Sequence, residues 1–185
     1  MACEFVQLDV TLPKYLIRHF NETIFFALFQ LINPILILVA AFILPFTTLL
    51  ERVPALLLMV LGTLLQASSP FWNVVTGMGK LAVPFFLTQF SLGESLSQPL
   101  LNEMAMKMAP RGQEAFYASS VTAPKLAARL LGLGMSGGLL SQFCPNASEC
   151  AIPAIAPLMI WVVTGAVAFI TPTGLLLLWW RKWIR

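Results

Sequence analysis

The sequence predicts an all-α protein, a polytopic bundle of about five transmembrane helices, and three observations support this fold class. Of the 185 residues, 58% are hydrophobic and 10% are charged, whereas an ordinary soluble domain carries roughly a quarter charged residues. The mean hydropathy is +0.84, a value typical of chains whose surface faces lipid. Uncharged stretches also recur along the chain, each close to the roughly 20 residues that cross a bilayer. We therefore expect the lipid bilayer to be the solvent of this chain.

The uncharged stretches define the expected helices in order. Three of them contain no charged residue and are long enough to cross a bilayer by themselves. Another is interrupted only by Glu94, and the remaining one follows Lys125 and Arg129. Short connections between the stretches favour antiparallel neighbours. The expected spans are 23–50, 54–77, 80–107, 115–142 and 152–181.

Two regions follow from these spans, an extramembrane segment at 1–22 and the five-helix bundle at 23–185. The first apolar run is too long to be the core of a signal peptide. If the N-terminus is outside, eight of the 11 Lys and Arg residues fall on the inner side, as basic residues do in membrane proteins. We therefore expect a multi-pass protein with an outer N-terminus and a cytoplasmic C-terminus.

The residue inventory argues against several other functions. A net charge of +3 is too small and too scattered for a nucleic-acid-binding protein. The single His19 and the three cysteines lack the spacing of a metal site. No metalloprotease, serine-hydrolase or phosphate-binding motif is present in the sequence. We expect no enzyme activity, no cofactor, no metal and no nucleic-acid partner.

Glu94 is the most informative residue, because it is the one acid deep inside a predicted span. A charge at the centre of a membrane helix costs on the order of 2.5–3.5 kcal/mol, so Glu94 should face protein or water. Burial favours the neutral form of a carboxylic acid, and reversible protonation suits a proton-coupled carrier. Three interpretations stay open: proton coupling or substrate contact, a static ion pair with Lys125 or Arg129, and a position close to the inner interface.

The two basic residues of the fourth span also allow two interpretations. Lys125 and Arg129 are four residues apart and so lie on one face of a helix. Near the inner interface, long basic side chains commonly extend toward the headgroups, and we favour this interpretation. The alternative is a basic lining that attracts an anionic substrate.

Small residues gather farther along the same span. Gly134 and Gly138 are four apart, with Gly132 and Ser136 nearby. Such spacing lets two helices approach closely, so we predict a packing face. A cavity lined by backbone is the alternative.

Cys144 and Cys150 bracket a short loop that contains Pro145 and Asn146. A turn there brings the two ends together, so we predict a disulfide in an oxidising compartment. Two free thiols are the alternative.

Several short motifs follow one another along the chain. The stretch Leu8–Arg18 comes first and is followed by Asn33-Pro34. The Gly-Glu motif at Gly93 and Glu94, the segment Ala109–Glu114 and Ser136–Leu140 come next. In this order the motifs resemble the C-terminal half of a major facilitator superfamily transporter, from a branch distantly similar to proton-dependent oligopeptide transporters. The resemblance covers nearly the whole chain.

This resemblance implies a partial major facilitator fold. Residues 1–22 would match the end of helix seven and its loop, and the spans would match helices eight to twelve. Glu94 and Asn33 would then be candidates for proton coupling or substrate contact, as would Lys125 and Arg129. Substrate sites in such carriers lie between the two halves, so the resemblance implies that an N-terminal half or another subunit is needed.

Two functions from different classes therefore remain. The first is a secondary transporter, present as its C-terminal half, for which the resemblance implies proton coupling. The second is a non-transporting membrane remnant that serves as an assembly or interaction subunit. Polar side chains within the predicted spans are expected to face lipid or an empty cavity when the other half is absent: Gln30, Asn33, Gln89 and Glu94.

Overall fold

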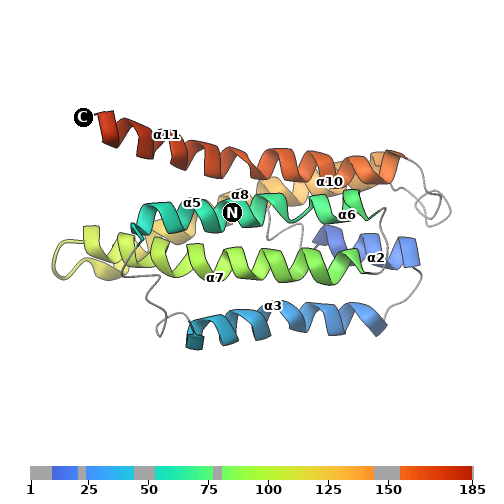
Figure 1. The fold of residues 1–185 in the computed structure, drawn as a ribbon, viewed down its shortest axis with the longest axis horizontal. Helices are drawn as coiled ribbons and strands as arrows, with labels where there is room; N and C mark the ends of the chain where they lie inside the picture. The colour runs from blue at the N-terminus through green and yellow to red at the C-terminus, as the bar shows by residue number, and fades with distance from the viewer. Residues whose placement is uncertain (1–9, 21–23, 44–52, 77–80, 144–154, 185) are drawn as a thin grey trace.

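The computed structural model describes residues 10–20, 24–43, 53–76, 81–143 and 155–184, and in these ranges the chain is helical with no strand. The predicted all-α class is therefore confirmed. The helices are α2 (Leu12–Phe20), α3 (Ile24–Ile43), α5 (Ala55–Ser68), α6 (Phe71–Val75), α7 (Ala82–Met108), α8 (Glu114–Phe143), α10 (Ile155–Ala168) and α11 (Ile170–Ile184). Figure 1 shows them running along one common axis.

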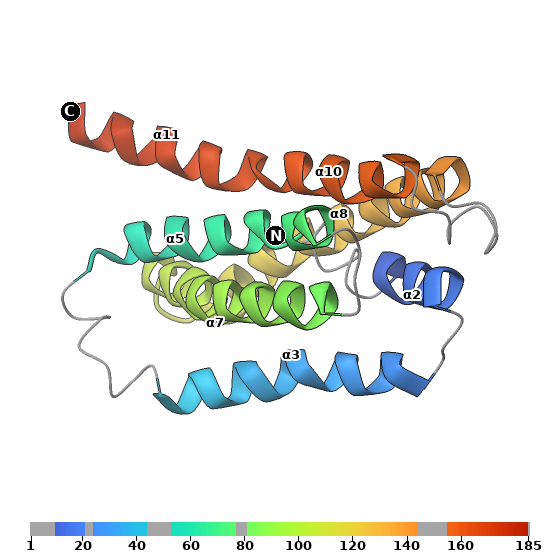
Figure 2. The ribbon, with the colours of Figure 1, turned by 45° about the vertical axis from the view of Figure 1, so that its right-hand side comes forward.

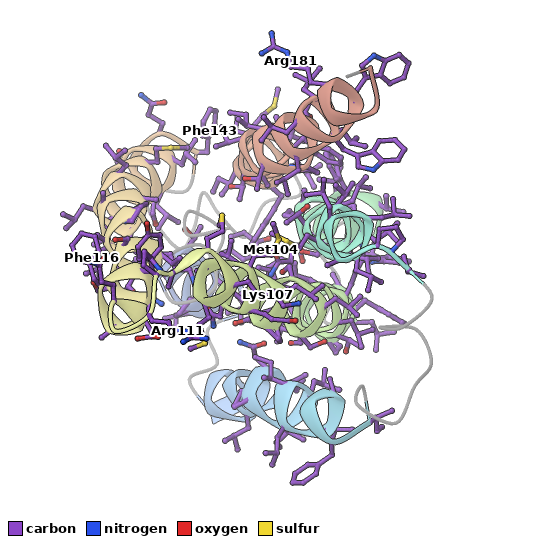
Figure 3. All side chains as sticks on the ribbon, turned by 90° about the vertical axis from the view of Figure 1, so that its left-hand side faces the viewer. Met104, Lys107, Arg111, Phe116, Phe143 and Arg181 are labelled. Carbon is purple, nitrogen blue, oxygen red and sulfur yellow. The ribbon has the colours of Figure 1, made fainter. Side chains whose placement is uncertain are left out.

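Helix α7 holds the bundle together, because it contacts α3, α5, α6 and α8. The view along the axis in Figure 3 shows α3 and α8 on two sides of α7, α5 on a third side, and α11 beyond α5. Figure 2 shows the short helix α2 at the end of the bundle opposite the C-terminus. Residues on α7 can therefore reach most of the other helices.

Two breaks in the helices have the same cause, a proline that lacks a backbone N–H. Pro70 separates α5 from α6, and the hydroxyl of Ser69 donates to the Gln66 carbonyl at 2.7 Å in place of the missing amide. Pro172 lies just after the break between α10 and α11. By contrast, Pro99 and Pro124 lie inside the continuous helices α7 and α8.

Two stretches of the described residues are long and apolar enough to cross a membrane. They are Ala55–Val75, with 21 residues, and Leu158–Arg181, with 24 residues. These stretches correspond to the second and fifth predicted spans. The other predicted spans are helices α3, α7 and α8, and their passage through a membrane remains a prediction.

Helix α2 packs into the core of the bundle, and the extramembrane position expected for residues 1–22 stays a prediction. Its buried side chains Leu12, Tyr15 and Leu16 join a cluster that includes Phe86 and Trp161. The rings of Tyr15 and Trp161 meet edge to face with centroids 5.3 Å apart. The apolar face of α2 thus belongs to the helical bundle itself.

Cys144 and Cys150 lie outside the described residues, so their predicted disulfide remains a prediction.

Candidate functional site

Glu94 lies in the interior of the bundle, where the sequence placed it. Its side chain is 9% exposed on α7. The preceding residue, Gly93, lies directly against Gly62 of α5: a Cβ atom on Gly93 would sit 2.5 Å from the Gly62 carbonyl oxygen, and one on Gly62 would sit 2.8 Å from the Gly93 oxygen. Only two glycines permit this approach. This contact between the two glycines, the crossing of α5 and α7, therefore fixes where Glu94 lies along the bundle axis. It also fixes the rotation of α7 about its own axis at that residue.

Lys125 extends from α8 toward the same part of α7. Its ammonium nitrogen Nζ donates to Oε1 of Gln98 at 2.6 Å. Gln98 lies one helical turn after Glu94, so both side chains are on neighbouring positions of one face. The Glu94 carboxylate interacts electrostatically with the Lys125 ammonium, and so does the Arg129 guanidinium. We call Glu94, Gln98 and Lys125 the polar centre.

This arrangement differs from the favoured expectation that Lys125 extends to the headgroups. The side chain turns inward because an acceptor on α7 is within reach, and a charge-assisted hydrogen bond is stronger than a neutral one. Arg129, one turn farther along α8, is exposed. The structure therefore brings Glu94 and Lys125 together in one centre and leaves Arg129 at its edge.

Asn33 of α3 is hydrogen-bonded to Ser91, which lies about one helical turn before Glu94 on α7. The hydroxyl of Ser91 donates to Asn33 Oδ1 at 2.6 Å and to the Leu87 carbonyl at 2.7 Å. These contacts tie α3 to α7 beside Pro34. Asn33 is thus linked to α7 by Ser91, three residues before Glu94. No contact of Asn33 with Glu94 or Lys125 is among those described.

Gln89 also finds its partners within the chain. Its amide nitrogen Nε2 donates to Ser68 Oγ at 2.6 Å and to the Leu65 carbonyl at 3.1 Å, and its Oε1 accepts from the Trp72 indole. Asn33 and Gln89 therefore have hydrogen-bond partners on neighbouring helices of this chain. The expectation that the polar side chains face lipid or an empty cavity without the other half stays a prediction. The side chain of Gln30 is not among those described.

A pocket of about 540 Å³ opens beside the polar centre. One wall is a stripe of α8 that includes Lys125, and the other wall is formed by α10 and α11. Met59 of α5 and Leu101 of α7 lie at its base. Apart from Lys125 and Thr171 the lining is apolar: Met59, Leu101, Val121, Pro124, Ala128, Val167, Ile170 and Leu175.

The glycines of α8 divide between two faces. Gly132, Ser136 and Leu140 are buried, and Ser136 shares a 2.7 Å hydrogen bond with Thr11. A Cβ atom on Gly134 or Gly138 would meet nothing within 4 Å among the described residues. Within this chain, the positions four apart from Gly132 face the core, whereas positions 134 and 138 turn away from it. The predicted packing role of Gly134 and Gly138 stays a prediction.

Comparison with protein-family models, with curated proteins and with solved structures finds no match for this chain. Its resemblance to one half of a major facilitator transporter therefore remains a prediction.

Sequence reasoning missed three residues of the site. Gln98 is four residues after Glu94, a spacing that indicates a shared helix face and that could have identified it. Gly62 is the lone glycine of its helix, but only the three-dimensional crossing reveals that it meets Gly93. Gln66, fully buried beside Gly93 with an amide that has no hydrogen-bond partner among described atoms, carries no signal in the sequence.

Proposed function

We propose that this chain is the C-terminal part of a secondary transporter in which Glu94 carries the coupled proton. The observation that supports this proposal is the buried Glu94 carboxylate beside the Lys125 ammonium, on two different helices. A buried acid changes its charge when it binds a proton, so the two helices attract one another differently in the two states. A difference of this kind shifts the populations of two conformations.

The proposal includes a membrane arrangement. Helices α3, α7 and α8 cross the bilayer with the two stretches that are apolar enough by themselves, so the chain crosses five times. Lys107, Arg111 and Arg181 lie at the end of the bundle viewed in Figure 3, and basic residues favour the cytoplasmic side. The N-terminus would then lie outside and the C-terminus inside.

A second chain is part of the same proposal. Gly134, Gly137 and Gly138 lie on a face of α8 where a Cβ atom would meet none of the residues that the structure describes within 4 Å. Small residues in a membrane helix allow a partner helix to approach. The N-terminal half of the transporter, or another subunit, would pack there and complete the substrate site.

The alternative is a membrane remnant that acts as an interaction subunit. The hydrogen bonds of Asn33 and Gln89 favour it, because a bundle that satisfies its own polar groups can persist alone. In that case the face of α8 that carries Gly134, Gly137 and Gly138 binds a partner protein. Glu94 and Lys125 then form a static pair that stabilises the bundle.

A measurement of proton transport distinguishes the transporter from the interaction subunit. The chain, together with the N-terminal half or subunit that completes the substrate site, would be reconstituted into vesicles that contain a pH-sensitive dye. Peptides, sugars and organic anions would then be added outside. Transport predicts acidification of the lumen by at least one class, and loss of that signal in Glu94→Gln with substrate exchange retained. Glu103→Gln is the control, since Glu103 is an exposed acid on the same helix, paired with Lys107 at 2.6 Å. Equal acidification in Glu94→Gln would contradict the proposal.

A further inference from the structure

An open groove of about 640 Å³ lies on the surface of helix α11. All of its lining residues belong to this one helix and recur at helical spacing, so they share a face. Gly174 lies in the middle of that face, and a Cβ atom there would meet none of the described residues within 4 Å. The missing side chain thus hollows the face at this position. The lining residues are Ile170, Thr171, Gly174, Leu175, Leu177, Leu178 and Arg181; we call this site the α11 groove.

The length of the α11 groove matches one leaflet of a bilayer. From Ile170 to Arg181 the helix advances by about 16 Å, at 1.5 Å for each residue. The hydrocarbon core is about 30 Å thick, so one leaflet contributes roughly 15 Å. The apolar stretch Leu158–Arg181 is long enough to cross the whole core, with Ile170 near its midpoint and Arg181 at its end. The groove therefore reaches from the middle of the bilayer to one surface.

Arg181 marks the end of the groove that lies at the lipid headgroups. It is exposed and follows Trp179 and Trp180, and tryptophan is enriched where membrane and water meet. Figure 3 shows Arg181 at the outer edge of the bundle, apart from Lys107 and Arg111 at the same end. A guanidinium group can donate two parallel hydrogen bonds to a phosphate. The end of the groove is thus suited to a phosphate group.

The rest of the groove is suited to a hydrocarbon chain. Ile170, Leu177 and Leu178 are 69%, 64% and 62% exposed, and the Thr171 hydroxyl and Arg181 are the polar side chains of the lining. A transmembrane helix of a partner protein would continue past the midpoint of the bilayer, where the groove ends. An acyl chain ends there as well, so its length fits the groove better.

The charge of the surrounding sequence favours an anionic headgroup over a neutral one. After Glu149 the chain contains Arg181, Lys182 and Arg185 and no acidic residue. Basic residues next to a membrane helix attract anionic lipids. A phospholipid with a net negative charge therefore matches both the apolar groove and its basic end.

We propose that the α11 groove binds one anionic phospholipid of the cytoplasmic leaflet. One acyl chain lies along Ile170–Leu178, and the phosphate accepts hydrogen bonds from the Arg181 guanidinium. The inference rests on the membrane arrangement of the proposed function and adds a lipid partner to it. The lining contains no residue of the polar centre, so the lipid site does not depend on proton transport.

The test compares two lipid probes that differ only in the headgroup. Phosphatidylglycerol and phosphatidylcholine, each with a photoreactive diazirine midway along one acyl chain, are added in trace amounts to phosphatidylcholine vesicles that hold the chain. After illumination, labelled peptides are quantified by mass spectrometry. The peptide of α3 is the internal reference, because that helix is apolar and contains no charged residue. The phosphatidylglycerol preference of the α11 peptide should exceed that of the α3 peptide roughly fivefold, as expected for one basic residue at the surface.

Three variants separate the groove from general surface charge. Arg181→Gln should lose most of the preference for phosphatidylglycerol at the α11 peptide. Arg111→Gln is the matched control, since it removes the same charge from the same end of the bundle but lies outside the groove, and it should keep the preference. Gly174→Phe should lower labelling of the α11 peptide by both probes, because its ring occupies the groove.

Equal labelling of α11 by the two probes in the wild type would overturn the proposal. So would an equal loss of preference in Arg181→Gln and Arg111→Gln, which would assign it to the general charge of this surface. Cross-linking of α11 to a second copy of the chain, with no lipid label, would assign the groove to a protein partner and also overturn it. Acyl-chain labelling of no peptide at all would contradict the membrane arrangement itself. A phosphatidylglycerol site in a protein that moves no protons would contradict the proposed transport alone.

Discussion

Gly62 of α5 and Gly93 of α7 lie so close together that a Cβ atom on either one would meet the backbone of the other within 2.8 Å. This crossing sits one residue before Glu94 and shares the interface with the buried Gln66 and Ser97 side chains. The position of the buried acid therefore depends on two residues that have no side chain.

Replacing Gly93 with Ala should destabilise the bundle, because the added methyl group meets the Gly62 oxygen and the Gln66 backbone, neither of which can move freely. Overpacking of this kind costs about 1–3 kcal/mol. Denaturation in mixed micelles measures the change. Gly174→Ala is the matched control, since a Cβ there meets nothing within 4 Å; equal stability of the two variants would mean that the crossing is looser than described.

The loop between α7 and α8 should face the cytoplasm. A cysteine at Ala109, in a chain without its native cysteines, is expected to react with a membrane-impermeant reagent only after the membrane is opened. Basic residues Lys107 and Arg111 flank this position, and they favour the inner side. Reaction in intact cells would reverse the proposed orientation.

Glu114 should hold the start of α8 in a pH-dependent way. Gly112 N–H donates to its Oε1 at 3.1 Å, and Gly112 adopts a φ of 85°, which glycine accommodates readily. Backbone N–H groups of Glu114 and Gly112 lower the pKa of the Glu114 carboxyl below its usual 4.5. Because the folded pKa is depressed, the stabilisation is present above 4.5 and is lost as the pH falls through the lowered value.

The measurement is amide hydrogen exchange at Gly112 in wild type and Glu114→Gln, compared at each pH. The wild type should be better protected at neutral pH, and the difference should vanish in strong acid where both side chains are neutral. A difference that persists unchanged in strong acid would show that the carboxylate charge is not its cause.

The sequence anticipated the helices well because uncharged length is a direct signal of a buried or lipid-facing helix. The five predicted spans correspond to α3, to α5 with α6, to α7, to α8 and to α10 with α11. Prolines mark both breaks between paired helices, which hydropathy alone does not resolve. The helix α2 was missed as part of the core, since Lys14 and Arg18 obscure its apolar face.

The site was predictable only in part. Glu94 is visible in the sequence as an acid inside an apolar run, but the direction of the Lys125 side chain depends on which helix faces it. Periodicity places Gly132, Gly134 and Gly138 near one another without saying which of them turns to the core. Tertiary contacts decide both questions, through Gln98 in the first case and Thr11 in the second.

The most direct test of the account is the protonation state of Glu94 itself. Infrared difference spectra of the chain in lipid, recorded as the pH is lowered, detect the carbonyl stretch of a protonated carboxylic acid. We predict a band that appears reversibly as the pH is lowered, persists in Glu103→Gln and is absent from Glu94→Gln. The same band in Glu94→Gln, or no band in the wild type across the stable pH range, would leave Glu94 as a static partner of Lys125 and contradict proton coupling at this centre.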